Sequence, residues 1–328
     1  MIKLQESWCI DERGEGQVDL GKVEALIEEA ERHGLGVYFG VTMEQAPAWL
    51  WRKYPDCRLV YSSGGKHEDP TQYLLPGDGK PGPCWDHPGA REAGARFIAK
   101  LARELGRHDN ILVWNIWQEI GFWPMRSDSL GFCYCPHTLA RFREWLDERY
   151  GGLDALNRAW RTGYGDWGEV EPPRIFAQVP PYIDWRYFMD DVYLVRALRW
   201  KADAFRDNDP KRRPIFSHVG YPTIGSGAEW RWAAEGDVFG SSCYPAWGPI
   251  YEWDADAPAA GLSVPRGVSL RQEAEMVAMG YDYVRSATGP DRQCWAAEFQ
   301  GGPISTSLHK GRTPSPEDIR LWVLTALS

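Results

Sequence analysis

The run from Asn110 to Gly121 is the stretch that most restricts how this chain can fold. It joins branched and aromatic residues, with His108-Asp109 in front and a glycine behind. A run of this kind predicts a strand that is buried on both faces, as in a parallel sheet. Glu119 stands where this strand ends. In a (β/α)8 barrel the carboxyl ends of the strands form the open face that carries the chemistry, so Glu119 is a candidate catalytic residue.

A second strand of the same type covers 293–299 and has Glu298 near its end. Two carboxyl groups at the same end of a barrel can serve as the general acid/base and the nucleophile in the hydrolysis of a glycosidic bond. Taken alone, a glutamate at the end of an apolar strand is more often a solvated rim residue. The pair therefore needs support from the rest of the chain.

Apolar strands alternate with helices along the whole sequence, which predicts the α/β class. The expected strands cover 1–9, 35–42, 110–121, 214–220, 237–244 and 293–299. The expected helices begin after Asp19 and Pro88 and cover 137–150, 153–160, about 185–207, 268–287 and 316–327. This pattern predicts a (β/α)8 TIM barrel in a single catalytic domain, 1–328. Because a barrel needs eight strands, we expect an incomplete one, with a β/α unit lacking at each end.

Composition excludes several classes of function. The formal charge is −9 and no basic stripe occurs, which argues against a nucleic-acid partner. No apolar run is long enough to span a bilayer, and the first residues do not resemble a signal peptide. Seven cysteines, an odd number, fit a reducing compartment, so we expect a cytoplasmic protein without a membrane contact. Eighteen tryptophans offer flat faces for sugars, although most are expected to serve in packing.

Several motifs give the chain a more specific likeness. They comprise Ala46–Leu50, Trp114–Gly121, Cys133–Cys135, Phe142–Leu146, Arg149–Gly151, Leu153–Asn157, Trp160, Tyr244-Pro245 and Glu298–Pro303. With these motifs the chain resembles the glycoside hydrolase family 42 β-galactosidases, of the retaining (β/α)8 clan. The block from Cys133 to Trp160 is the most specific part of this resemblance.

The resemblance implies a role for each rim residue. Glu119 is expected to be the acid/base and Glu298 the nucleophile of a double displacement, with their carboxyl groups about 5–5.5 Å apart. Tyr244 matches the clan tyrosine that holds the nucleophile. The residue before the acid/base is Asn in the clan, and here it is Gln118, one methylene longer, which leaves the sugar open.

Two more residues are expected to line the substrate pocket. His218 ends the expected strand 214–220, and Trp247 follows the strand that ends at Tyr244. A lone buried histidine is as often structural as functional, and so is a packed aromatic ring.

The resemblance also implies a structural zinc site. Cys84, Cys133 and Cys135 correspond to three of the four family thiolates, and the fourth position falls on Thr138. We expect neighbouring His137 to supply the missing ligand, giving a Cys3His set. The alternative is a group of buried free thiols. No cofactor is expected to take part in catalysis.

The chain is thus expected to hydrolyse terminal β-D-galactosides of oligosaccharides. Another retaining β-glycosidase of the same clan is the second interpretation, and a sugar-binding barrel without activity, or an inactive fragment, is the third. The resemblance further implies a homotrimer for the full-length protein.

Overall fold

A computed structural model describes residues 1–66, 82–121, 131–175, 179–220, 227–245, 270–302 and 313–327. The chain forms two compact units, Met1–Phe216 and Ser217–Ser328, and each is described by itself. Among the residues in these ranges, no helix is both long enough and apolar enough to cross a membrane.

Parallel strands form the centre of the first unit. They are β1 (Ile2–Ser7), β4 (Val37–Thr42) and β5 (Ile111–Trp117), with β4 in the middle. All six residues of β4 are buried, as expected for a strand covered on both faces. Lys3 pairs with Tyr38, and Gly40 pairs with Asn115. A further strand, β6 (Ile215–Val219), starts where this unit ends.

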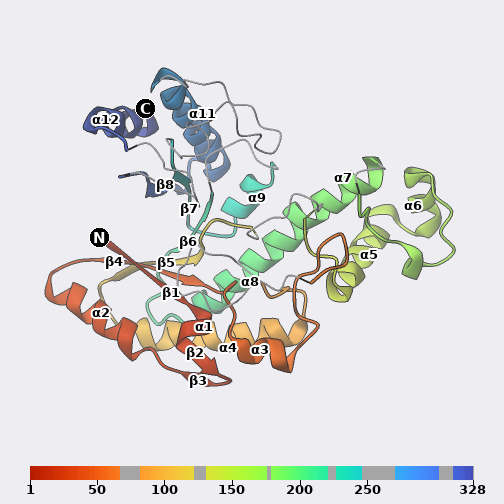
Figure 1. The fold of residues 1–328 in the computed structure, drawn as a ribbon, viewed down its shortest axis with the longest axis horizontal. Helices are drawn as coiled ribbons and strands as arrows, with labels where there is room; N and C mark the ends of the chain where they lie inside the picture. Colours follow the sequence, from red (N-terminus) through yellow and green to blue (C-terminus); the bar gives the residue numbers. More distant parts are fainter. Residues whose placement is uncertain are drawn as a thin grey trace, which may run out of the picture. The chain divides into compact units, whose positions relative to one another are not determined.

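Long helices accompany these strands, and their residues explain where they begin. Figure 1 shows α2 (Gly21–Arg32) and α4 (Pro88–Leu105) along one side of the strands. Asp19 accepts a hydrogen bond from the backbone N–H of Gly21 at 3.0 Å, and Pro88 occupies the first turn of α4.

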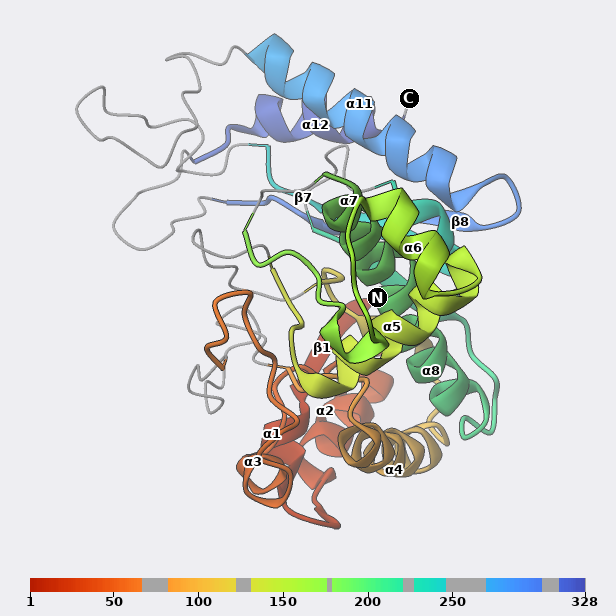
Figure 2. The ribbon, with the colours of Figure 1, turned by 90° about the vertical axis from the view of Figure 1, so that its right-hand side faces the viewer.

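The helices after β5 form a second group, seen together in Figures 1 and 2. They are α5 (Pro136–Tyr150), α6 (Leu153–Trp160), α7 (Val179–Tyr187), the π-helical turn η2 (Phe188–Tyr193) and α8 (Leu194–Arg206), with the short 3-10 turn η1 (Trp167–Glu169) between α6 and α7. Helix α8 contacts both α4 and β5.

Short elements surround the end of β1. They are α1 (Trp8–Asp11), the antiparallel pair β2 (Glu12–Gly14) and β3 (Gln17–Val18), and α3 (Ala48–Lys53). Side chains hold them in place: Trp8 donates to the carboxylate of Glu12 at 2.5 Å, and Trp49 donates to the Glu12 carbonyl at 3.2 Å.

The second unit contains a parallel pair of strands backed by two helices. Strands β7 (Val238–Cys243) and β8 (Gln293–Phe299) pair along their whole length. The helices α11 (Leu270–Thr288) and α12 (Pro316–Leu327) lie side by side in both views, and the short α9 (Glu229–Ala233) packs on α11.

The predicted α/β class is confirmed, and a strand lies in each of the six predicted ranges. Two strands are shorter than predicted: the first ends at Ser7, where α1 begins, and β5 ends at Trp117, where the chain bends. One helix boundary was wrong. The helix expected from about Trp185 begins at Val179, because Pro180 and Pro181 lie in its first turn, where the absence of an N–H is harmless.

Candidate active site

Glu119 lies in a bend just beyond β5. Its φ is +53°, a left-handed conformation that non-glycine residues rarely adopt. Such a conformation costs about 1–3 kcal/mol and persists only where the surroundings impose it. The chain therefore turns sharply at this glutamate, whose side chain is only half-buried.

Buried contacts fix the strand that leads to Glu119. Asn115 donates through its side-chain amide to the Tyr38 hydroxyl at 2.5 Å, and its carbonyl oxygen accepts from the backbone N–H of Trp117 at 3.3 Å. Both side chains are buried. Strands β4 and β5 are thereby joined by side chains as well as by their backbones.

A buried ion pair lies against the last residue of β5. The Lys201 ammonium lies 3.5 Å from the centre of the Trp117 ring and pairs with the Glu44 carboxylate. Lys201 is 0% exposed and Glu44 is 1% exposed. Trp85 also donates to Glu44, at 3.3 Å. The cation–π contact and the ion pair fix the ring of Trp117, which lies two residues before Glu119 in the chain.

This ion pair was not predicted from the sequence, although the pattern of α8 contains a signal for it. Leu194, Leu198 and Phe205 form the buried stripe of that helix, and Lys201 falls on the same stripe. A lysine on an apolar helical face must find a buried counter-ion.

In the second unit, Glu298 lies one residue before the end of β8 and pairs in register with Ser242 of β7. The Tyr244 hydroxyl donates to Glu298 Oε2, and the Ser242 hydroxyl lies 3.5 Å from the same oxygen. A carboxylate that accepts from hydroxyl donors is held in one orientation and is stabilised as the anion.

The neighbouring residues of β7 and β8 explain why Glu298 faces these hydroxyls. Successive side chains of a strand point to opposite faces, so Phe299 and Cys243 lie on the other side of the pair. There Cys243 packs with Val277, Tyr281 and Trp322, and Phe299 packs against this cluster. The helices α11 and α12 thus fix the strand ends by burying one face.

The other predicted pocket residues have different surroundings. The side-chain carbonyl oxygen of Gln118 accepts from Lys3 Nζ at 3.1 Å. His218 is fully buried in β6. Trp247 lies outside the described residues.

Three of the predicted metal ligands come together. The sulfur atoms of Cys84, Cys133 and Cys135 all lie within 4.8 Å of one another, and all three residues are buried. Cys84 precedes α4, and the other two precede α5. Contacts with Cys133 and Cys84 lower the pKa of the Cys135 thiol, whereas burial raises the pKa of the Cys84 and Cys133 thiols. Three buried sulfur atoms this close together are a suitable ligand set for a structural metal ion.

The structure gives His137 other neighbours than these thiols. Its Nε2 lies 2.9 Å from Asp56, whose second oxygen lies 3.3 Å from Nε2 of His87. Beside the sulfurs lies Thr138 instead, with its hydroxyl 3.0 Å from Cys84 and 3.5 Å from Cys135.

Asp56, His87 and His137 have the spacing of a metal site, but their hydrogen bonds argue against one. The backbone N–H of Ala90 donates to His87 Nδ1 at 3.1 Å, so the proton of the neutral ring is on Nε2. Burial lowers the pKa of His87, which favours this neutral form. Nε2 therefore donates to Asp56 and offers no lone pair to a cation.

Comparisons with known proteins point to one family. The model of a family described as β-galactosidase, Glyco_hydro_42, matches residues 3–328. The β-galactosidase BglY of Alicyclobacillus acidocaldarius is 28% identical over 250 residues, which are 74% of this chain and 33% of that protein. A β-galactosidase of Thermus thermophilus is 26% identical over 338 residues, 98% of this chain and 47% of that protein.

The solved structures agree on the fold. The crystal structure of a β-galactosidase from the psychrophilic Marinomonas ef1 superposes with a TM-score of 0.77 at 21% identity, and covers 99% of this chain and 48% of that one. The chain thus spans about a third to a half of the length of the curated relatives it matches.

Proposed function

Because this chain belongs to the Glyco_hydro_42 family of β-galactosidases, we propose that it hydrolyses terminal β-D-galactosides with retention of configuration. The substrate is a galactoside or an oligosaccharide with a terminal galactose. The relatives from Alicyclobacillus acidocaldarius and Thermus thermophilus are named β-galactosidases, which supports this activity.

In the proposed mechanism, Glu119 donates a proton to the leaving oxygen while Glu298 attacks the anomeric carbon. The C–O bond to the leaving group breaks as the bond to Glu298 forms. Glu119, now ionised, then takes a proton from water, and the water oxygen displaces Glu298. Glu119 is protonated again and Glu298 is again a carboxylate, so the cycle balances.

The hydrogen bond from Tyr244 to Glu298 is the observation that carries this proposal. A nucleophilic carboxylate must be ionised and must point at one carbon atom, and a hydroxyl donor serves both needs. Glu119 has the other role in this mechanism, because the general acid must bring a proton to the leaving oxygen.

The test is hydrolysis of an aryl β-galactoside by the full-length protein. We expect Glu298→Gln to abolish turnover. Glu119→Ala should retain a slow first step on a substrate with a good leaving group, and added azide should then restore turnover by replacing water. Full activity of Glu298→Gln, or the absence of activity in the parent protein, would reject the proposal and favour a sugar-binding role.

Gln118 supports a second candidate within the same clan, a β-glycosidase for a different sugar. Its side-chain carbonyl oxygen accepts a hydrogen bond from Lys3, and its side chain is one methylene longer than that of asparagine. The Gln118 amide therefore extends further than an asparagine amide and has its own hydrogen-bond partner. Relative kcat/KM for aryl β-galactoside, β-glucoside and β-fucoside distinguishes the two, and Gln118→Asn is expected to shift the preference.

We also propose that Cys84, Cys133 and Cys135 hold a structural zinc ion. Their buried, convergent sulfurs support this, and the hydroxyl of Thr138 lies 3.0 Å from the sulfur of Cys84. Zinc would join the segments that precede α4 and α5 and would supply no catalytic chemistry. Metal analysis of the purified protein should give about one zinc per chain. Cys135→Ser should lower both the zinc content and the melting temperature, whereas zinc near zero in the parent protein would contradict the proposal.

Two further proposals concern the environment of the protein. All seven cysteines are free thiols, which supports a reducing compartment such as the cytoplasm. The family membership supports a homotrimer for the full-length protein, and sedimentation measures it directly.

A further inference from the structure

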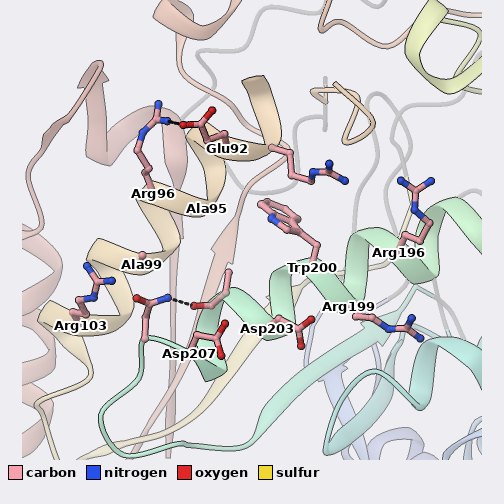
Figure 3. A pocket seen from close by; sticks show the side chains of 13 residues that line it. Glu92, Ala95, Arg96, Ala99, Arg103, Arg196, Arg199, Trp200, Asp203 and Asp207 are labelled. Atoms are coloured by element: carbon pink, nitrogen blue, oxygen red, sulfur yellow. Dashed lines mark hydrogen bonds and ion pairs between the residues drawn. The ribbon is translucent and has the colours of Figure 1, made fainter. Parts of the chain in front are cut away.

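A groove of about 620 Å³ lies between α4 and α8, on the outside of the first unit (Figure 3). Its lining residues recur every four positions, so each set forms one face of its helix. Helix α4 contributes the stripe Arg91, Ala95, Ala99 and Arg103, and α8 contributes Arg196, Trp200 and Ala204. The alanines leave the middle of the groove open, and longer side chains stand at its ends.

The groove is basic in an acidic protein. Five arginines line it, against the three acidic residues Glu92, Asp203 and Asp207, whereas the whole chain has a formal charge of −9. A chain with a negative net charge is not expected to gather arginines on one part of its surface. The local excess of guanidinium groups is therefore a feature of this groove and not of the composition.

The arginines differ in whether they have a counter-ion. Arg96 bonds Glu92 at 2.9 Å, and Arg196 bonds Asp86 at 3.1 Å. Within the part of the chain that the structure describes, Arg91 and Arg103 make no ion pair. Arg91 is half-buried at the start of α4. An incompletely solvated guanidinium without a counter-ion is a ready partner for an anion.

Trp200 adds an aromatic ring to this site. It is half-buried, and Figure 3 shows its ring pointing from α8 toward α4. One side is supported by Trp85, with the ring centres 4.9 Å apart. Gly94 gives the indole its room, since a Cβ at this position would lie 3.1 Å from it. The ring is thus fixed in place at the groove.

We propose that this groove binds an acidic oligosaccharide, one that carries sulfate or carboxylate groups. The indole of Trp200 offers a flat apolar surface to the C–H face of a sugar ring, and Arg91 binds the anionic substituent. The acidic residues that line the groove repel a continuous phosphate backbone, so spaced charges on a glycan fit better than a nucleic acid. The groove is lined by residues of α4 and α8, and neither Glu119 nor Glu298 is among them. This inference rests on the proposed function in one respect, namely that the protein acts on glycans.

Calorimetry on the Glu298→Gln protein tests the site without turnover. The probes are a sulfated galacto-oligosaccharide, a galacturonate oligosaccharide and a neutral galacto-oligosaccharide of equal length. We expect at least one acidic probe to bind more tightly than the neutral one, and the two acidic arms tell sulfate from carboxylate recognition. Arg91→Glu should weaken that binding about tenfold or more, the loss of one charge-assisted contact.

Arg158→Glu is the matched control, because it makes the same change of charge at an exposed site on α6 of the same unit. Equal weakening by both variants would reduce the effect to overall charge and overturn the proposal. Competition by inorganic sulfate at the concentration of the oligosaccharide would leave only a simple anion site, which also overturns it. Tighter binding of an acidic helical peptide would assign the groove to a protein partner instead.

Hydrolysis of a small neutral galactoside separates this proposal from the proposed function. In the otherwise unchanged protein, Arg91→Glu should leave that hydrolysis unaltered. If the parent protein binds the acidic probe but hydrolyses nothing, the groove stands and the proposed function fails. If hydrolysis occurs and no acidic probe binds, the proposed function stands and the proposal for the groove fails.

Discussion

The hydroxyl of Tyr244 contacts one oxygen of Glu298, and a single-atom change removes that contact. Tyr244→Phe keeps the ring and deletes the donor. A hydrogen bond to an ionised group contributes about 1.5–3 kcal/mol, so kcat for an aryl β-galactoside should fall about 10- to 100-fold. The melting temperature should change little, because the ring stays in place.

Tyr283→Phe is the control for this prediction. It removes a hydroxyl that donates to Glu229 at 2.7 Å in the same unit and is expected to leave kcat unchanged. Equal losses in the two variants would mean that the Tyr244 hydroxyl acts through general stability.

Asp11 is a second residue whose environment makes a measurable prediction. Burial, with the nearby charge of Glu6, raises the pKa of Asp11 to about 8. The folded protein therefore keeps a proton there that the unfolded chain releases at about pH 4. Because the unfolded state binds fewer protons in between, the free energy of unfolding should fall as pH rises from about 4 to about 8.

Asp11→Asn tests this dependence, because an amide cannot titrate. Urea unfolding between pH 5 and pH 8.5 should show a shallower decline in the variant than in the parent. Glu6, whose pKa burial also raises, and Lys22, whose charge opposes the shift of Asp11, remain in both proteins. Parallel curves for the two proteins would show that Asp11 is ionised in the folded state.

Three elements meet at the Lys201–Glu44 pair, which joins α8, the segment after β4 and the end of β5. Lys201→Met leaves the Glu44 charge buried without a partner and should destabilise the protein by about 3–5 kcal/mol in urea unfolding. Replacing both residues, in Lys201→Met with Glu44→Leu, should restore most of this loss, since no buried charge is left. Lys53→Met, which breaks an exposed pair with Glu15, should have little effect. If the double variant is no more stable than Lys201→Met alone, the unpaired charge of Glu44 is not the cause of the loss, and the two side chains contribute through their packing in the core.

The strands could be predicted from the sequence because each is a long buried run, as β4 and β5 illustrate. The short α1, the β2–β3 pair and α3 could not. Their local sequences carry weak propensities, and they depend on tertiary contacts such as the hydrogen bonds of Trp8 and Trp49 with Glu12.

The candidate site was predictable to a similar degree. Glu298 lies near the end of β8 and Tyr244 directly follows the neighbouring β7, and strand ends can be read from the sequence. The partner of His137 cannot be read in this way, because Asp56 is 81 positions away and meets it only through folding. The same holds for Lys201 and Glu44, where the sequence gives a lysine on an apolar stripe without its distant counter-ion.

On the scale of the whole molecule, the two proposed catalytic glutamates belong to different compact units of the chain. Glu119 comes from Met1–Phe216 and Glu298 from Ser217–Ser328. Each carboxyl group is positioned by its own unit, the first by a strained bend and the second by Tyr244. Double displacement requires both carboxyl groups to act on the same sugar, although the two residues are far apart in sequence.

The configuration of the first product tests this cooperation. If Glu298 attacks carbon directly, the two carboxyl groups must come within about 5–5.5 Å, and galactose leaves as the β anomer because configuration is inverted twice. Proton NMR of aryl β-galactoside hydrolysis by the full-length protein should therefore show the β-anomeric signal first, with the α signal growing later through mutarotation. An initial α signal would mean a single displacement by water, which needs the wider spacing of about 6.5–9.5 Å. That outcome would leave both glutamates in the reaction but would make Glu298 a general base.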